Sequence, residues 1–82
     1  MALYFFDTRD NDRLVEDDVG LDFPDLETVK EQAAVSLAEM ARDVLPGSVK
    51  RVLSVEVRDE SQLVLCATLT FEAIVLIGSQ RL

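Results

Sequence analysis

The stretch PDLETVKEQAAVSLAEMARDVLPG, residues 24–47, decides the fold because it has the pattern of one long amphipathic helix. Its apolar side chains recur at spacings of three and four residues, which predicts a single core-facing stripe: Leu26, Val29, Ala33, Leu37, Met40, Ala41 and Val44. Asp25 has the short carboxylate that a helix N-cap uses to accept a backbone hydrogen bond. Pro46 and Gly47 predict where the helix ends, because neither continues helical geometry well.

The sequence before this helix predicts short extended segments. Residues 3–9 favour a β-strand with Tyr4 and Phe6 on one face and Leu3 and Phe5 on the other, so that both faces are partly buried. The segments that follow are expected to be a turn, a strand, a second turn and an extended piece: residues 10–12, 13–16, 17–20 and 21–23.

After the helix the apolar period changes to two. Leu53, Val55 and Val57 alternate with polar residues, which predicts a strand with one core face. A turn at residues 59–62 leads to a last strand over residues 63–71. One face of that strand is expected to carry Leu63, Leu65, Ala67, Leu69 and Phe71.

The opposite face of the last strand also begins apolar, with Val64 and Cys66. This favours an interior or interface strand over an exposed edge. The apolar run at residues 73–77 fits either a continuation of the strand or a short helix. Together the patterns predict an α+β fold, an antiparallel sheet of about four strands with one helix on one face, in the order β-β-α-β-β. Residues 1–82 are expected to form a single domain, because 82 residues suffice for one core only.

The charge balance excludes several kinds of partner. The chain has 16 Asp and Glu against 8 Lys and Arg, a net charge of −8. Phosphate backbones and anionic bilayers are therefore repelled, so no nucleic acid and no membrane is expected as a partner. The apolar run at residues 73–77 is too short to span a bilayer, and we expect a cytoplasmic protein.

The sequence offers no set of catalytic residues. It contains no histidine, which removes the commonest general base and metal ligand. Its one cysteine, Cys66, lies in an apolar strand, where we expect it to be buried and unreactive. We therefore expect no catalytic residue and no enzyme activity.

An acidic stretch is the only candidate metal site in the sequence. It consists of Asp7, Asp10, Asp12, Glu16, Asp17 and Asp18. Its spacing lacks the ligand order of a calcium-binding EF-hand loop, so we interpret it as turn chemistry on a solvated hairpin. The chain also lacks a glycine-rich phosphate loop, having 3 glycines in all. No metal-binding or cofactor-binding residue and no cofactor is expected.

Three short motifs carry a resemblance to a known family. Tyr4-Phe5-Phe6-Asp7, Asp17-Asp18-Val19-Gly20 and Pro24-Asp25-Leu26-Glu27 resemble a domain of unknown function found in short uncharacterised proteins of soil alphaproteobacteria. The resemblance covers most of the chain, although the tail at residues 74–77 is more apolar here. It implies a fold and a compartment, and it implies no activity or catalytic residue. A weaker likeness, at the level of the fold only, is to HicB-type antitoxins.

Three hypotheses for function follow. The first is a non-enzymatic, self-associating protein-interaction module, because one helix can cover only one face of a sheet that is apolar on both. A homodimer built on the last strand and tail is then expected. The second is an antitoxin-like inhibitor of a basic protein, which the acidic charge would suit. The third is a domain that binds a small ligand or metal through the acidic hairpin.

Overall fold

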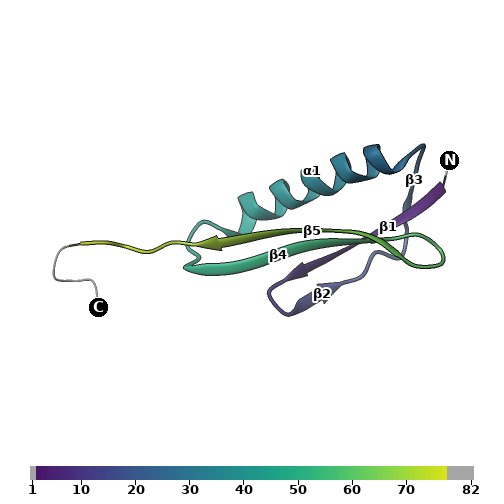
Figure 1. The fold of residues 1–82 in the computed structure, drawn as a ribbon. Coiled ribbons are helices and arrows are strands. Elements are labelled where there is room, and N and C mark those ends of the chain that lie inside the picture. The colour runs from purple at the N-terminus through teal and green to yellow at the C-terminus, as the bar shows by residue number, and fades with distance from the viewer. Residues whose placement is uncertain (1, 78–82) are drawn as a thin grey trace.

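An antiparallel sheet with one helix on one face makes up the structure, a computed structural model that describes residues 2–77 (Figure 1). Residue 1 and residues 78–82, which the predicted single domain includes, lie outside the described part. The elements are β1 (Ala2–Asp10), β2 (Arg13–Val15), β3 (Leu21–Phe23), α1 (Leu26–Val44), β4 (Lys50–Arg58) and β5 (Leu63–Glu72). The strand order is β2-β1-β4-β5, and β3 pairs with the start of β1. The predicted α+β class is confirmed, with one strand more before the helix.

The ends of α1 follow the predicted capping chemistry. Asp25 is the N-cap, and its carboxylate accepts hydrogen bonds from the Thr28 backbone N–H at 2.9 Å and the Thr28 hydroxyl at 2.7 Å. The helix stops at Val44, and Gly47 then takes a φ of 89°, a conformation that favours glycine. None of the helices in the described part of the chain has the length and apolar character that a membrane crossing needs.

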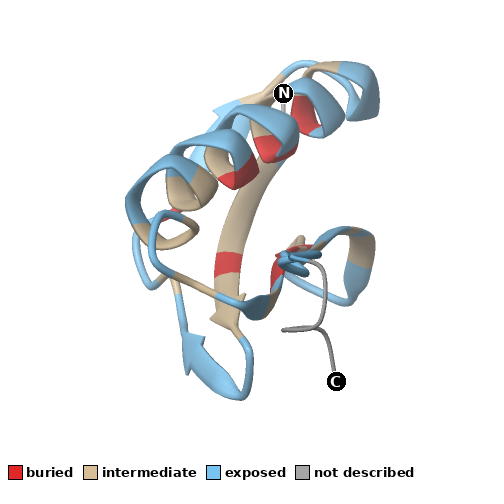
Figure 2. Ribbon diagram, turned by 90° about the vertical axis from the view of Figure 1, so that its left-hand side faces the viewer, coloured by how far each residue is buried: buried red, intermediate tan, exposed pale blue. Residues whose placement is uncertain are grey.

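The core lies between α1 and the middle of the sheet, as Figure 2 shows. Its buried side chains come from α1 and β4: Val29, Ala33, Leu37, Leu53, Val55 and Val57. Aromatic rings close one end, where Phe6 packs edge-on against Phe23 with ring centroids 5.6 Å apart. Leu26, predicted to be in the helix stripe, is instead 48% exposed, because it stands at the first position of α1 beyond the reach of the core.

A β-bulge changes the faces predicted for the start of β5. Val57 is opposite Leu65 while Arg58 is opposite Leu63, so Val64 is the extra residue. Val64 packs against the core, and Leu63 lies beside Arg58 on the other face, where it is 60% exposed. The prediction that Leu63 shares a face with Leu65 is therefore wrong.

β5 lies at an edge of the sheet, so within one chain the prediction of an interior strand is wrong. Among the described strands it pairs with β4 alone. The Ala73 N–H still donates to the Val49 carbonyl at 2.8 Å, and beyond this point the chain runs away from the sheet (Figure 1). Residues 73–77 are neither strand nor helix, and the side chains from Ile74 to Ile77 are exposed.

Candidate functional site

Asp17 is the most connected residue of the predicted acidic stretch. One carboxylate oxygen accepts the backbone N–H of Phe6 at 3.0 Å, and the other accepts those of Val19 at 3.0 Å and Gly20 at 3.2 Å. The carboxylate thus lies between β2 and β3 and takes the place of a strand partner for Phe6. The Asp17 side chain therefore accepts hydrogen bonds from backbone N–H groups that would lack a partner where the edge strand is interrupted.

Asp7 and Arg58 complete this cluster on the face of the sheet opposite α1. Arg58 donates to Asp7 at 2.8 Å and to the Asp17 carbonyl at 2.8 Å, and Asp7 also accepts the Asp17 N–H at 2.9 Å. The guanidinium lies over the Phe5 ring, 4.6 Å from its centroid. These contacts join β1, β4 and the loop before β3. We call Asp7, Asp17 and Arg58 the edge cluster.

Both carboxylates of the edge cluster are held in the ionised form. Burial raises the pKa of Asp7, but the hydrogen bonds from Arg58 and the Asp17 N–H outweigh it, so the pKa lies below its ordinary value. The backbone N–H groups of Phe6 and Val19 lower the pKa of Asp17. Carboxylates of this kind stay charged at neutral pH, which suits a structural role better than proton transfer.

The rest of the acidic stretch is dispersed over the surface. Asp10 forms a bidentate ion pair with Arg51, with both distances 2.8 Å. Outside the stretch, Glu56 of β4 pairs with Arg9 at 3.0 Å. The remaining members are exposed: Asp12, Glu16 and Asp18. In the part of the chain that the structure describes, no three His, Cys, Asp or Glu side chains gather in a way that suits a metal ion.

Cys66 is exposed, so the prediction of a buried thiol is wrong. It lies opposite Glu56 in the β4 and β5 register, on the face away from α1, and its sulfur is 3.8 Å from the Thr68 hydroxyl. The apolar neighbours in sequence misled the prediction. They belong to the helix-covered face, whereas no described helix covers the face that carries Cys66.

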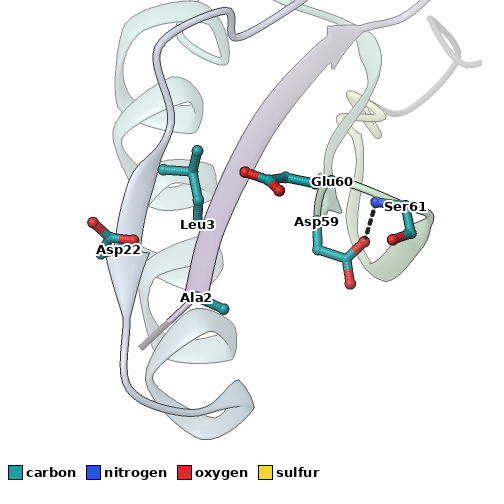
Figure 3. A pocket seen from close by; sticks show the side chains of 6 residues that line it. All are labelled: Ala2, Leu3, Asp22, Asp59, Glu60 and Ser61. Carbon is teal, nitrogen blue, oxygen red and sulfur yellow. Dashed lines mark hydrogen bonds between the residues drawn. The ribbon is translucent and has the colours of Figure 1, made fainter.

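A hollow between the start of β1, β3 and the turn after β4 holds acidic side chains that the sequence did not bring together (Figure 3). Its volume is about 440 Å³, and its lining is Ala2, Leu3, Asp22, Asp59, Glu60 and Ser61. The Asp59 carboxylate is engaged in the turn, where it accepts the N–H groups of Ser61 at 2.7 Å and Gln62 at 2.8 Å. Among the described residues, this lining contains no lysine or histidine of the kind that activates a serine hydroxyl as a nucleophile.

An apolar groove runs between α1 and β5. We call it the α1/β5 groove and define it by its lining residues, of which one is charged: Ala34, Leu37, Ala38, Ala41, Arg42, Leu45, Pro46, Ala67, Thr68, Leu69 and Phe71. It consists of two neighbouring hollows of about 400 and 530 Å³. The helix side is shallow because it presents alanines, and Leu69 on the strand side is 37% exposed. Its apolar character fits a protein surface better than a polar small molecule.

Fold and surfaces together define a small α+β domain with an ion-paired sheet face and an apolar groove beside a sheet edge. The chain matches the family described as Domain of unknown function (DUF6894) over residues 3–71, and it belongs to that family. Neither the search of curated proteins nor the search of solved structures found a match.

Proposed function

We propose that this protein is a non-enzymatic interaction module of the cytoplasm that self-associates as a homodimer through β5 and the tail. The observation that carries the proposal is the concentration of exposed apolar side chains at this end of the chain. Ile74, Val75, Leu76 and Ile77 are between 59% and 69% exposed, and they directly follow β5 and its groove. A contiguous apolar surface of this kind is typical of a protein contact.

The energetics favour burial of the tail against a second chain. Burying one Ile, Val or Leu side chain is worth about 1.5 to 3 kcal/mol, so several together can offset the cost of association. Within one chain the tail leads away from the sheet and does not fold back over it (Figure 1). A two-fold dimer would cover the tails of both chains at once.

The charged side chains support a non-enzymatic role. The arginines of β1 and β4 are bound within the domain: Arg9 to Glu56, Arg51 to Asp10, and Arg58 to Asp7. They are therefore occupied in holding strands together. A net charge of −8 also disfavours nucleic acid and anionic lipid as partners, which leaves protein surfaces.

Size-exclusion chromatography with light scattering, from micromolar to millimolar protein, tests the proposal. We expect the mass of two chains, and Leu76→Asp should give a soluble monomer because a carboxylate cannot be buried unpaired in a dimer contact. Val19→Asp is the matched control, since Val19 is 77% exposed in a loop remote from the tail. A single-chain mass throughout would contradict self-association. A Leu76→Asp variant that stays dimeric would remove the tail from the interface.

A further inference from the structure

We propose that two copies of this chain join their β5 strands antiparallel to one another, about a two-fold axis at Thr68, to form one continuous sheet. This inference rests on the proposed self-association and assigns it a surface and a register. Three features of the described residues carry it: the backbone groups at the β5 edge, the self-complementary side chains of β5, and the alanines of α1 beside it.

The hydrogen-bond pattern shows which backbone groups of β5 are free to pair. The Ala73 N–H bonds to the Val49 carbonyl at 2.8 Å, and the N–H and C=O groups of a strand alternate between its two sides. The N–H and C=O groups of the odd-numbered residues from Leu65 onward therefore point toward β4. Those of Cys66, Thr68 and Thr70 point away from β4, at the free edge of the sheet.

The β5 edge lacks the features that usually prevent strand pairing. From Leu63 to Phe71 it contains no charged residue and no proline. Its bulge lies at the Leu63 end, so the residues from Leu65 to Glu72 form a regular ladder with β4. An edge of this length and composition is a template for another strand.

An antiparallel pair centred on Thr68 places side chains of similar polarity opposite one another on both faces of the sheet. On the helix side, Leu65 lies opposite the partner's Phe71, and Ala67 lies opposite the partner's Leu69, so these pairs are apolar. On the other side, Cys66 lies opposite the partner's Thr70. Such a pair makes about six backbone hydrogen bonds, through Cys66, Thr68 and Thr70 of the two strands, which lies within the range of protein interfaces.

The position of α1 is compatible with the proposed two-fold axis at Thr68. α1 runs alongside β4 and β5 (Figure 1), and Ala34, Leu37 and Ala38 line one hollow together with Thr68. The middle of α1 is therefore level with the proposed axis. Since strands are about 4.8 Å apart, a helix lying over β4 and β5 would come within about 10 Å of its symmetry mate, which is the distance between packed helices.

The residues on this flank of α1 suit a close antiparallel helix contact. Ala34 and Ala38 are exposed and small, and Ala34 would meet the partner's Ala38. Glu31 and Arg42 lie at nearly equal distances in sequence on either side of this centre, so Glu31 would lie near the partner's Arg42. Opposite charges at both ends favour the antiparallel arrangement and oppose a parallel one.

Disulfide trapping tests the register. In a Cys66→Ser background, Thr68→Cys places two thiols directly across the axis, with Cα atoms about 5.5 Å apart, which is within the range of a disulfide. We expect most of this variant to become a covalent dimer under mild oxidation. Thr70→Cys in the same background is the matched control. Its two thiols would be roughly 13 Å apart, so little cross-linking is expected.

Restoring the native cysteine reverses the expectation for the control. Thr70→Cys with Cys66 retained should cross-link, because this register sets Cys66 opposite the partner's residue 70. Efficient cross-linking of Thr70→Cys in the Cys66→Ser background, with none of Thr68→Cys, would overturn the proposed axis.

Two pairs of variants test the edge without cross-linking. Thr68→Pro removes an outward N–H that no other described strand of the same chain uses, whereas Thr68→Val keeps it. We expect monomers for the first and dimers for the second, with the helix signal in circular dichroism unchanged. Ala38→Glu should weaken the dimer at least tenfold, whereas Asp43→Glu on the other flank of α1 should not.

The outcomes separate this inference from the proposed function. A dimer by light scattering that neither Thr68→Pro nor Ala38→Glu weakens, and in which Thr68→Cys does not cross-link, would overturn the β5 pairing and leave self-association standing. A single-chain mass at all concentrations would overturn both. Loss of the dimer in Thr68→Pro with retention in Leu76→Asp would support the β5 pairing and exclude the tail.

Discussion

The two edges of the sheet differ in how far their backbone N–H and C=O groups are left exposed to pair with another strand. The β2 and β3 edge consists of two pieces of three residues each, and the Asp17 carboxylate fills the interruption between them. The β5 edge is one strand of ten residues. Short, interrupted strands discourage pairing, whereas a long uncharged strand invites it. We call the β2 and β3 edge the closed edge and the β5 edge the open edge. A chain with one edge of each kind can pair only once, so the proposed pairing would stop at two copies.

The closed edge depends on a tight loop as well as on Asp17. Gly20 has a φ of 79° and is buried against the first strand. A Cβ at this position would lie 2.9 Å from the Phe5 ring and 3.1 Å from Leu3. The loop can therefore approach β1 only because residue 20 has no side chain.

Gly20→Ala should have the largest effect on the closed edge. We expect a loss of about 3 kcal/mol in the free energy of unfolding, from backbone strain at positive φ together with the clash against Phe5. Gly47→Ala is the control, because Gly47 has a φ of 89° with nothing within 4 Å of its Cβ position. It should lose about 1 kcal/mol from strain alone. Urea denaturation measures both, and equal losses would show that the close approach to Phe5 is not tight.

Asp17→Ala should have the next largest effect. It leaves the Phe6 N–H without its acceptor, and we expect a loss of about 1 to 2 kcal/mol, toward the lower end because the site is partly exposed. Asp18→Ala is the control, since Asp18 is exposed and its neighbour makes the contacts. Hydrogen exchange at Phe6 should accelerate in Asp17→Ala and not in Asp18→Ala. An unchanged exchange rate would show that water replaces the carboxylate at no cost.

Acid should lower the stability of the closed edge and leave the open edge unchanged. We expect this effect to be the smallest of the three. The pKa values of Asp7 and Asp17 are lowered in the folded protein, so their contribution to stability is complete above the ordinary value of 3.8. It is lost as the pH falls below 3.8 through the folded pKa values, because protonation then favours the unfolded chain. In an NMR titration, the amide signals of Val19 and Gly20 should shift over this range, while that of Thr68 should not. An equal shift at Thr68 would contradict a local effect.

The sequence was most informative where a feature is local. Asp25 caps the helix because its carboxylate reaches a backbone N–H only three residues away. Asn11 and Gly20 take positive φ in the predicted turns, because asparagine tolerates this conformation and glycine has no Cβ to oppose it.

Of the candidate site, turn chemistry was predicted for the whole acidic stretch, and it describes Asp17, which accepts the N–H groups of Val19 and Gly20. It is wrong for Asp7 and Asp10, which lie in β1 and pair with arginines of β4. The central contact of the site, Arg58 with Asp7, joins residues 51 apart and has no local signal.

The periodicity of the sequence by itself determined the α+β class, the helix with its cap, and the core face of β4, because these depend on side chains a few residues apart. The tertiary structure alone decided that β5 is an edge, that a bulge turns Leu63 outward, that Cys66 is exposed, and that alanines of α1 lie beside β5. Period-two alternation specifies which side chains share a face, but it does not specify which strands are neighbours. Strand order follows from pairing between distant residues, and this pairing created both the closed edge and the open one.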